Sequence, residues 1–152
     1  MRHGKAEQTP GIDDFDRGLI DKGMMDVRRQ ARQVFAQDLP DRFVFSSSIR
    51  TTQTVLHVQD ELNFSKEIIE EEGSLYLGTV KELLDIVNDL DDRWKSVCLV
   101  GHNPGLIHLA EYLTESVVGY LSPSGIVKVT FEGRWAELSK GIAVMQLHAE
   151  PT

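Results

Sequence analysis

The sequence predicts an α/β sandwich with a mainly parallel sheet. Segments with strand character are each followed by segments with helical periodicity, which is the order of a parallel sheet with crossover helices. The run Val97 to Val100 is apolar at every position, as in a strand covered by helices on both faces. No repeat or linker interrupts the chain, so we expect a single domain over residues 1–152.

The strands are predicted from β-branched and aromatic runs. Residues 42–46 (Arg-Phe-Val-Phe-Ser) follow the turn-forming pair Pro40-Asp41 and are typical of a strand. Near the C-terminus, residues 126–131 and 142–148 alternate between apolar and polar side chains. These two segments are expected to form a hairpin or to be neighbours in the sheet.

Four helices are predicted between and before the strands. Two of them follow from apolar residues that recur on one helical stripe, namely Val27, Ala31, Val34 and Phe35 in one segment and Val80, Leu83, Leu84 and Val87 in the other. Weaker helical patterns cover residues 51–62 and 106–114. Each of these weaker segments comes soon after a predicted strand.

Composition excludes several functional classes. The formal net charge of -8 argues against binding nucleic acid or an anionic membrane by bulk electrostatics. Cys98 is the only cysteine, so no internal disulfide can form, and a reducing cytoplasm is the expected location. No apolar stretch is long enough to span a bilayer. We therefore expect a cytoplasmic protein with a local basic pocket for any phosphate.

Three short segments combine cationic or titratable side chains with Gly, Ser or Pro: residues 2–4 (Arg-His-Gly), residues 46–54, and residues 101–105 (Gly-His-Asn-Pro-Gly). In open α/β sheets ligands bind beyond the carboxyl ends of strands, so these segments are expected to meet there. Each segment alone also suits a structural role, as a surface turn, a capped helix start or a tight strand-to-helix turn. Their occurrence together favours a site.

These segments carry groups suited to phosphate chemistry. Arg2 and Arg50 offer planar forks of N–H donors that match paired phosphate oxygens, and Arg50 lies near the start of a predicted helix. A neutral imidazole at His3 could attack phosphorus, because two guanidinium charges disfavour its protonation. A protonated His102 could stabilise the transferred phosphoryl group. Gly4 would leave room for close approach.

Together the three segments resemble the histidine phosphatase superfamily, and within it the short phosphohistidine phosphatase branch typified by SixA. The resemblance covers nearly the whole chain. It includes the Arg-His-Gly motif at residues 2–4, the Ser-rich segment 46–50 that ends in an arginine, and the second histidine motif at 101–105. Residues 16–19 (Asp-Arg-Gly-Leu) and the pair Leu75-Tyr76 add weaker matches. The fold implied is the phosphoglycerate mutase-like three-layer α/β/α sandwich.

The resemblance also implies roles for the motif residues. His3 is expected to be the nucleophile and His102 a second catalytic residue. Contacts to the substrate are expected from Arg2, Gly4, Arg50 and Asn103. No metal or cofactor is expected, because the arginines already supply the positive charge.

Two features depart from the pattern of the superfamily. Its members have a strand directly before Arg-His-Gly, whereas only Met1 precedes the motif here, so the N-terminal strand is expected to be missing before Arg2. Larger members use a carboxylate after the second helix as general acid. Glu72 occupies roughly that interval and is the candidate, with a solvated acidic loop as the competing interpretation.

The expected substrate follows from the short interval before Val97. It spans about 30 residues, which leaves no room for a lid over the site. A shallow, open pocket suits a phosphohistidine on a protein surface better than a small metabolite. The alternatives are a phosphoglycerate mutase-like phosphotransferase, a phosphomonoesterase acting on small phosphorylated substrates, and an inactive phosphate-binding pseudoenzyme.

Overall fold

A computed structural model, which describes residues 1–152, contains a three-stranded parallel sheet at its centre. The strands are β1 (Arg42–Phe45), β2 (Ile69–Glu71) and β3 (Val97–Val100), in the order β2-β1-β3. In the middle strand β1, Phe43 pairs with Ile69 on one side and with Cys98 on the other. All three carboxyl ends therefore lie at the same edge of the sheet.

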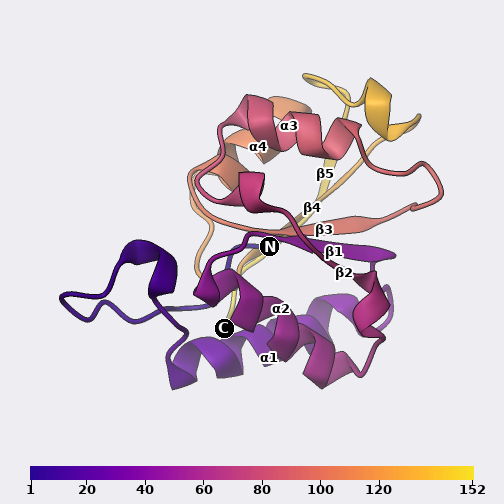
Figure 1. Ribbon diagram of the computed structural model, residues 1–152. Helices are drawn as coiled ribbons and strands as arrows, with labels where there is room; N and C mark the ends of the chain where they lie inside the picture. The colour runs from indigo at the N-terminus through magenta and orange to yellow at the C-terminus, as the bar shows by residue number, and fades with distance from the viewer.

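Helices cover both faces of this sheet (Figure 1). Helices α1 (Asp21–Phe35) and α2 (Ile49–Leu62) lie on one face, and α3 (Val80–Asn88) and α4 (Gly105–Thr114) lie on the other. The alternation of side chains along β1 divides the core: Phe43 belongs to the cluster with α1 and α2, whereas Val44 belongs to the cluster with α3 and α4. The predicted three-layer α/β/α sandwich is confirmed.

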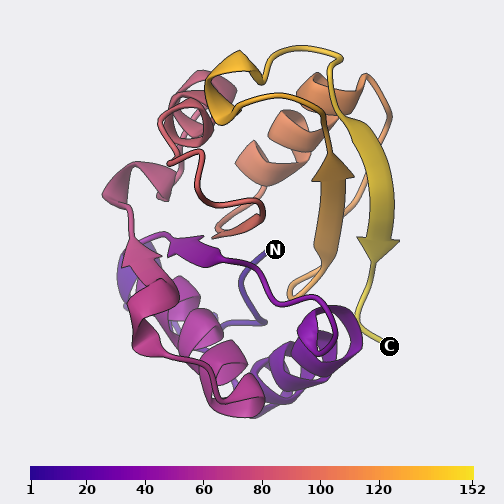
Figure 2. The same cartoon turned by 90° about the vertical axis from the view of Figure 1, so that its right-hand side faces the viewer.

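The two remaining strands form a second sheet. Strands β4 (Ile126–Thr130) and β5 (Val144–Ala149) pair antiparallel, with Ile126 opposite Ala149. They lie to one side of the three-stranded sheet, and the chain start lies between the two groups (Figure 2). The sequence left open whether these segments form a hairpin or are sheet neighbours, and the structure shows them paired directly with each other.

The first three residues connect the two sheets by backbone hydrogen bonds. The amide of Gly101, which follows β3, donates to the carbonyl of Met1, and the amide of His3 donates to the carbonyl of Gly101. On the other side, the amide of Arg2 donates to the carbonyl of Gly125, just before β4. These bonds place Arg2 and His3 at the carboxyl end of β3.

Strand β2 was not predicted from the sequence. It has only three residues, and at this edge of the sheet Ile69 is half-buried while Glu70 and Glu71 are exposed, so no apolar alternation marks it.

Cys98 is buried in β3, and this burial raises the pKa of its thiol, as expected for a small core side chain. No helix has the length and apolar character that a membrane crossing requires.

Candidate active site

The backbone of the Arg-His-Gly segment is anchored to α1 and α2. The amide of Gly4 donates to Thr54 Oγ1 at 2.9 Å, and the Thr54 hydroxyl donates to the carbonyl of Arg50 at 2.7 Å. A Cβ atom at Gly4 would lie 2.7 Å from Cγ2 of Val27. The structure therefore explains Gly4 by its close approach to α1, rather than by the room for a ligand that the sequence suggested.

The hydrogen bonds of His3 define which ring nitrogen carries the proton. His3 Nδ1 lies 2.7 Å from the carbonyl oxygen of Gly4. Because a carbonyl only accepts, Nδ1 must be the protonated nitrogen. His3 Nε2 lies 3.2 Å from Arg50 Nε and accepts its N–H. A neutral His3 thus presents an unprotonated Nε2 to the Arg50 guanidinium.

The surroundings keep His3 neutral. The pKa of His3 is lowered from 6.5 to about 3, mainly by burial and further by the charges of Arg50 and Arg2, although the hydrogen bond to Gly4 opposes the shift. The imidazole is therefore unprotonated at neutral pH, which is the form that can act as a nucleophile.

Arg50 is the centre of the cluster and is almost fully buried. It is the second residue of α2 and so belongs to the first turn of that helix. Besides Nε at His3, its Nη2 donates to His102 Nδ1 at 3.2 Å and to Asp14 Oδ2 at 3.0 Å. One planar side chain therefore holds two histidines and a carboxylate.

His102 lies at the end of β3, and its ring centroid is 5.2 Å from that of His3. Its Nδ1 accepts from Arg50, while Nε2 lies 2.8 Å from Ser46 Oγ. Burial, followed by the charge of Arg50, lowers the pKa of His102 to about 4. The sequence suggested a protonated His102, but without a bound anion the structure favours the neutral ring.

The side chains of Arg2 and Asn103 both donate to the backbone carbonyl of Leu121. Arg2 Nη1 donates to the oxygen of Leu121 at 2.9 Å, and Asn103 Nδ2 donates to the same oxygen at 2.8 Å. Arg2 Nε and Asn103 Oδ1 are both buried and have no partner within the protein. The charge of Arg2 contributes to lowering the pKa of both site histidines.

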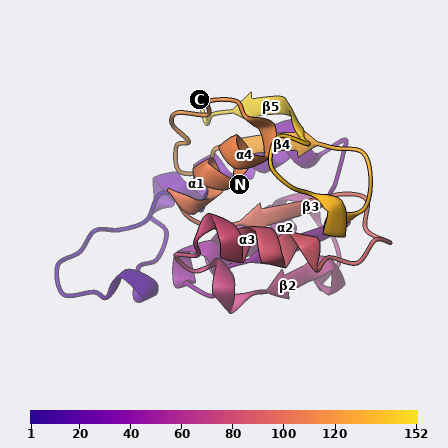
Figure 3. The same ribbon diagram turned by 90° about the horizontal axis from the view of Figure 1, so that it is seen from above.

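A carboxylate that the sequence did not single out contacts this cluster. Asp14 belongs to a short 3-10 helix (Asp14–Asp16) in the loop between Ala6 and Leu19, which projects from the body of the protein (Figure 3). Asp14 Oδ2 accepts from the Tyr76 hydroxyl at 2.7 Å as well as from Arg50. The hydrogen bonds from Tyr76 and Arg50 hold the pKa of Asp14 well below its ordinary value. Asp14 is therefore ionised at the mouth of the site.

Both residues of this contact lie at or near weak motif matches in the sequence. The match at residues 16–19 begins two positions after Asp14, and Tyr76 is the second residue of the Leu-Tyr pair. The T-shaped contact of Tyr76 with His102, with ring centroids 5.4 Å apart, shows why that pair lies at the site.

Glu72 has a different place from the one that the sequence suggested. Its Oε1 accepts from the amide of Ser74 at 2.9 Å, which caps a short 3-10 helix. The side chain lines a separate acidic groove together with Glu70, Glu82 and Asp85. No hydrogen bond joins Glu72 to His3, Arg50 or His102. The structure therefore gives no support for Glu72 as general acid, because its carboxylate is engaged in capping.

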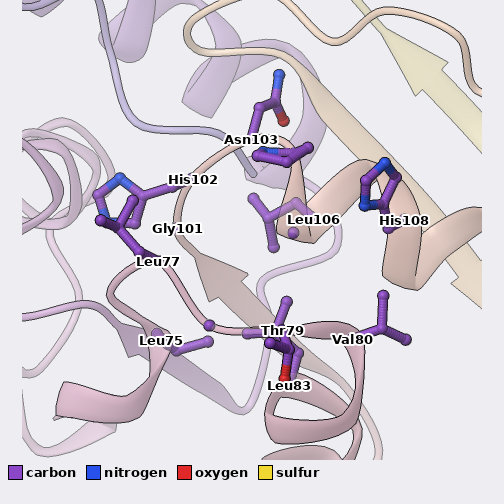
Figure 4. A pocket seen from close by; sticks show the side chains of 13 residues that line it. Leu75, Leu77, Thr79, Val80, Leu83, Gly101, His102, Asn103, Leu106 and His108 are labelled. Carbon is purple, nitrogen blue, oxygen red and sulfur yellow. The ribbon is translucent and has the colours of Figure 1, made fainter.

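A groove adjoins His102 on the side of α3 and α4. It has a volume of about 340 Å³ and is lined by residues from the segments 75–83 and 101–108, which we call the α3–α4 groove (Figure 4). The sequence predicted a shallow site because the interval before Val97 is short. The interval forms no lid, but its Leu75–Leu83 segment builds one wall of this groove.

Comparison with known proteins adds to this geometry. No model of a known protein family matches the chain. An uncharacterized protein of Mycobacterium tuberculosis is 27% identical over 95% of this chain and 96% of its own length. The structure of the protein histidine phosphatase SixA complexed with tungstate has a TM-score of 0.85 with 24% identity, over 99% of this chain and 94% of the other. That structural likeness shows that the two proteins share a fold.

A more similar sequence with a solved structure is the SixA protein from Agrobacterium tumefaciens. It is 26% identical, covers 86% of this chain and 88% of the other, and has a TM-score of 0.76. The likeness to solved SixA structures agrees with the resemblance of the sequence motifs to the histidine phosphatase superfamily.

The depressed pKa values of the two site histidines predict that the protein is less stable in acid. In the unfolded chain both site histidines titrate near 6.5, whereas the folded values are about 3 for His3 and about 4 for His102. Between these limits the unfolded state binds more protons, so the free energy of unfolding falls as the pH falls below about 6.5. Each histidine contributes up to about 1.4 kcal/mol per pH unit.

His3→Gln should therefore flatten this dependence. Urea unfolding at several pH values between about 4.5 and 7.5 measures the slope, with the exposed His108→Gln as the control. Parallel curves for His3→Gln and wild type would contradict the assignment of a buried neutral imidazole.

Proposed function

We propose that this chain is a phosphatase that transfers a phosphoryl group from its substrate to His3 and then to water. One observation carries the proposal: the unprotonated Nε2 of His3 is held beside the buried Arg50 guanidinium in a site that also contains Arg2 and His102. A nucleophile and its anion-binding groups are therefore assembled in one place.

The first step forms a covalent intermediate. The phosphoryl group of the substrate binds to the N–H donors of Arg50 and Arg2, which match its oxygens. His3 Nε2 then attacks phosphorus, and the bond from phosphorus to the leaving group breaks. The leaving group departs with the bonding electron pair and takes up a proton from solvent. The Nδ1–H bond to Gly4 orients the ring during this step and stabilises its positive charge.

The second step restores the enzyme. Water attacks the phosphorus of phospho-His3, the P–N bond breaks, and inorganic phosphate leaves as the water proton is released. His102 supports both steps, because a bound dianion next to its ring raises the pKa and favours the protonated, donating form. Ser46 orients this ring through the contact with Nε2.

A phosphohistidine on a protein is the proposed substrate. Asp14 is the carboxylate in contact with the cluster, and it is ionised, so it has no proton to give to a leaving group. A site whose contacting carboxylate cannot act as an acid suits a labile P–N bond better than the P–O bond of a phosphate ester. The absence of a lid over the site also admits a side chain that protrudes from a protein surface.

The experiment compares leaving groups. We expect a higher kcat/KM for a phosphohistidine peptide than for 3-phosphoglycerate or a sugar phosphate, measured as phosphate release with equal enzyme. A strong preference for a sugar phosphate would favour the phosphomonoesterase alternative. Transfer to a second hydroxyl without phosphate release would favour a phosphotransferase, and binding without turnover would indicate a pseudoenzyme.

A further inference from the structure

Two leucines next to His102 contribute to neither hydrophobic core cluster. Leu106, the second residue of α4, is half-buried, and Leu77 in the loop before α3 keeps 62% of its surface exposed. Neither leucine packs against the residues of the two core clusters. Apolar surface in contact with water is unfavourable, so leucines at the edge of a site without a core role indicate a contact surface.

Both leucines line the α3–α4 groove. Figure 4 shows Leu106 between the side chains of His102 and His108, with Leu77 beside His102. The groove therefore starts at a ring of the proposed phosphoryl site and continues along the first turn of α4. No lysine, arginine or carboxylate is among its lining residues.

The walls of the groove are fixed by close backbone packing. A Cβ atom at Gly105 would lie only 2.8 Å from the carbonyl oxygen of Gly78, so the two loops touch. A capping box between Thr79 and Glu82 fixes the start of α3. The groove is thus formed before a ligand arrives, which reduces the entropy cost of binding.

We propose that the α3–α4 groove holds an apolar side chain that neighbours the phosphorylated residue of a polypeptide substrate. The inference rests on the proposed function, because a phosphoryl group held by His3 and Arg50 places the adjoining part of its substrate beside His102. A volume of about 340 Å³ lies within the range of pockets that enclose whole small ligands, so the groove has ample room for an apolar side chain. A charged side chain there would lose water without gaining a partner.

The test uses two phosphohistidine peptides that differ in the neighbouring residue, Leu or Gly, together with phosphoramidate, which has a P–N bond and no side chain. The wild-type enzyme should hydrolyse the Leu peptide with about tenfold higher kcat/KM, the effect expected when much of a leucine side chain leaves water. Leu106→Ser should reduce this preference to about twofold or less and keep the wild-type rate with phosphoramidate. Leu56→Ser, at an exposed leucine of α2, is the matched control.

A binding measurement separates this proposal from the proposed function. Leucine methyl NMR with peptides that carry a non-hydrolysable phosphonate analogue of phosphohistidine should show tighter binding of the Leu peptide and shifts at the Leu77 and Leu106 methyls. If nothing is hydrolysed but this difference persists, the phosphatase function fails and the groove stands. Equal kinetics and equal binding of the two peptides overturn the groove, as does a Leu106→Ser variant that loses activity equally on all substrates.

Discussion

Replacing His3 with alanine should abolish phosphate release, with a fall in kcat of at least about 10³-fold, because the proposed nucleophile is removed. Cys98 cannot substitute, since it is buried within β3 and its pKa is raised. Phosphate release from a phosphohistidine peptide measures the effect, and His148→Ala, at an exposed histidine of β5, should keep the wild-type rate.

The intermediate can be detected directly. Rapid acid-free quenching with radiolabelled substrate should trap a phosphoryl group that is lost in acid and is absent from His3→Ala. Mapping of the label to another residue would contradict the mechanism, and so would a His3→Ala protein that folds and retains near-normal turnover.

Removing the guanidinium of Arg50 should have the second largest effect. Arg50→Met should lower kcat/KM by about 10² to 10³-fold, because the group that faces His3 Nε2 also binds the charge that develops on the phosphoryl group. Binding of vanadate, a phosphate mimic, should weaken in parallel. Arg50→Lys should recover little, because an ammonium cannot contact both histidines and an oxyanion in one plane.

Replacing Asp14 with asparagine should strengthen anion binding, whereas the Arg50 substitutions weaken it. Its carboxylate accepts from the same Arg50 Nη2 that contacts His102, so it competes with an incoming anion. Asp14→Asn should therefore tighten vanadate binding by about fivefold, as expected for one partly exposed charge pair. Asp13→Asn, an exposed neighbour, is the control. Weaker vanadate binding in Asp14→Asn would show that Asp14 positions Arg50 and does not compete.

The sequence alone determined the layers, and it predicted several residues that the structure brings together. Strand β3 was predicted over its full length, because a run that is apolar on both faces is typical of a covered parallel strand. The meeting of Arg50 and His102 was predictable too, since both follow strands whose carboxyl ends share one edge of the sheet. Short-range patterns and this one topological rule were sufficient for these features.

Only the tertiary structure decided the chemistry within the cluster. The proton on His3 is placed by the carbonyl of Gly4, and the neutral state of His102 follows from its burial beside Arg50. The contact of Asp14 joins residues that are 36 positions apart through an irregular loop, and Glu72 is drawn into a cap by Ser74. Such contacts have no sequence period, because they depend on how separate segments pack. The motifs therefore predicted members of the candidate site, and the fold decided their protonation and partners.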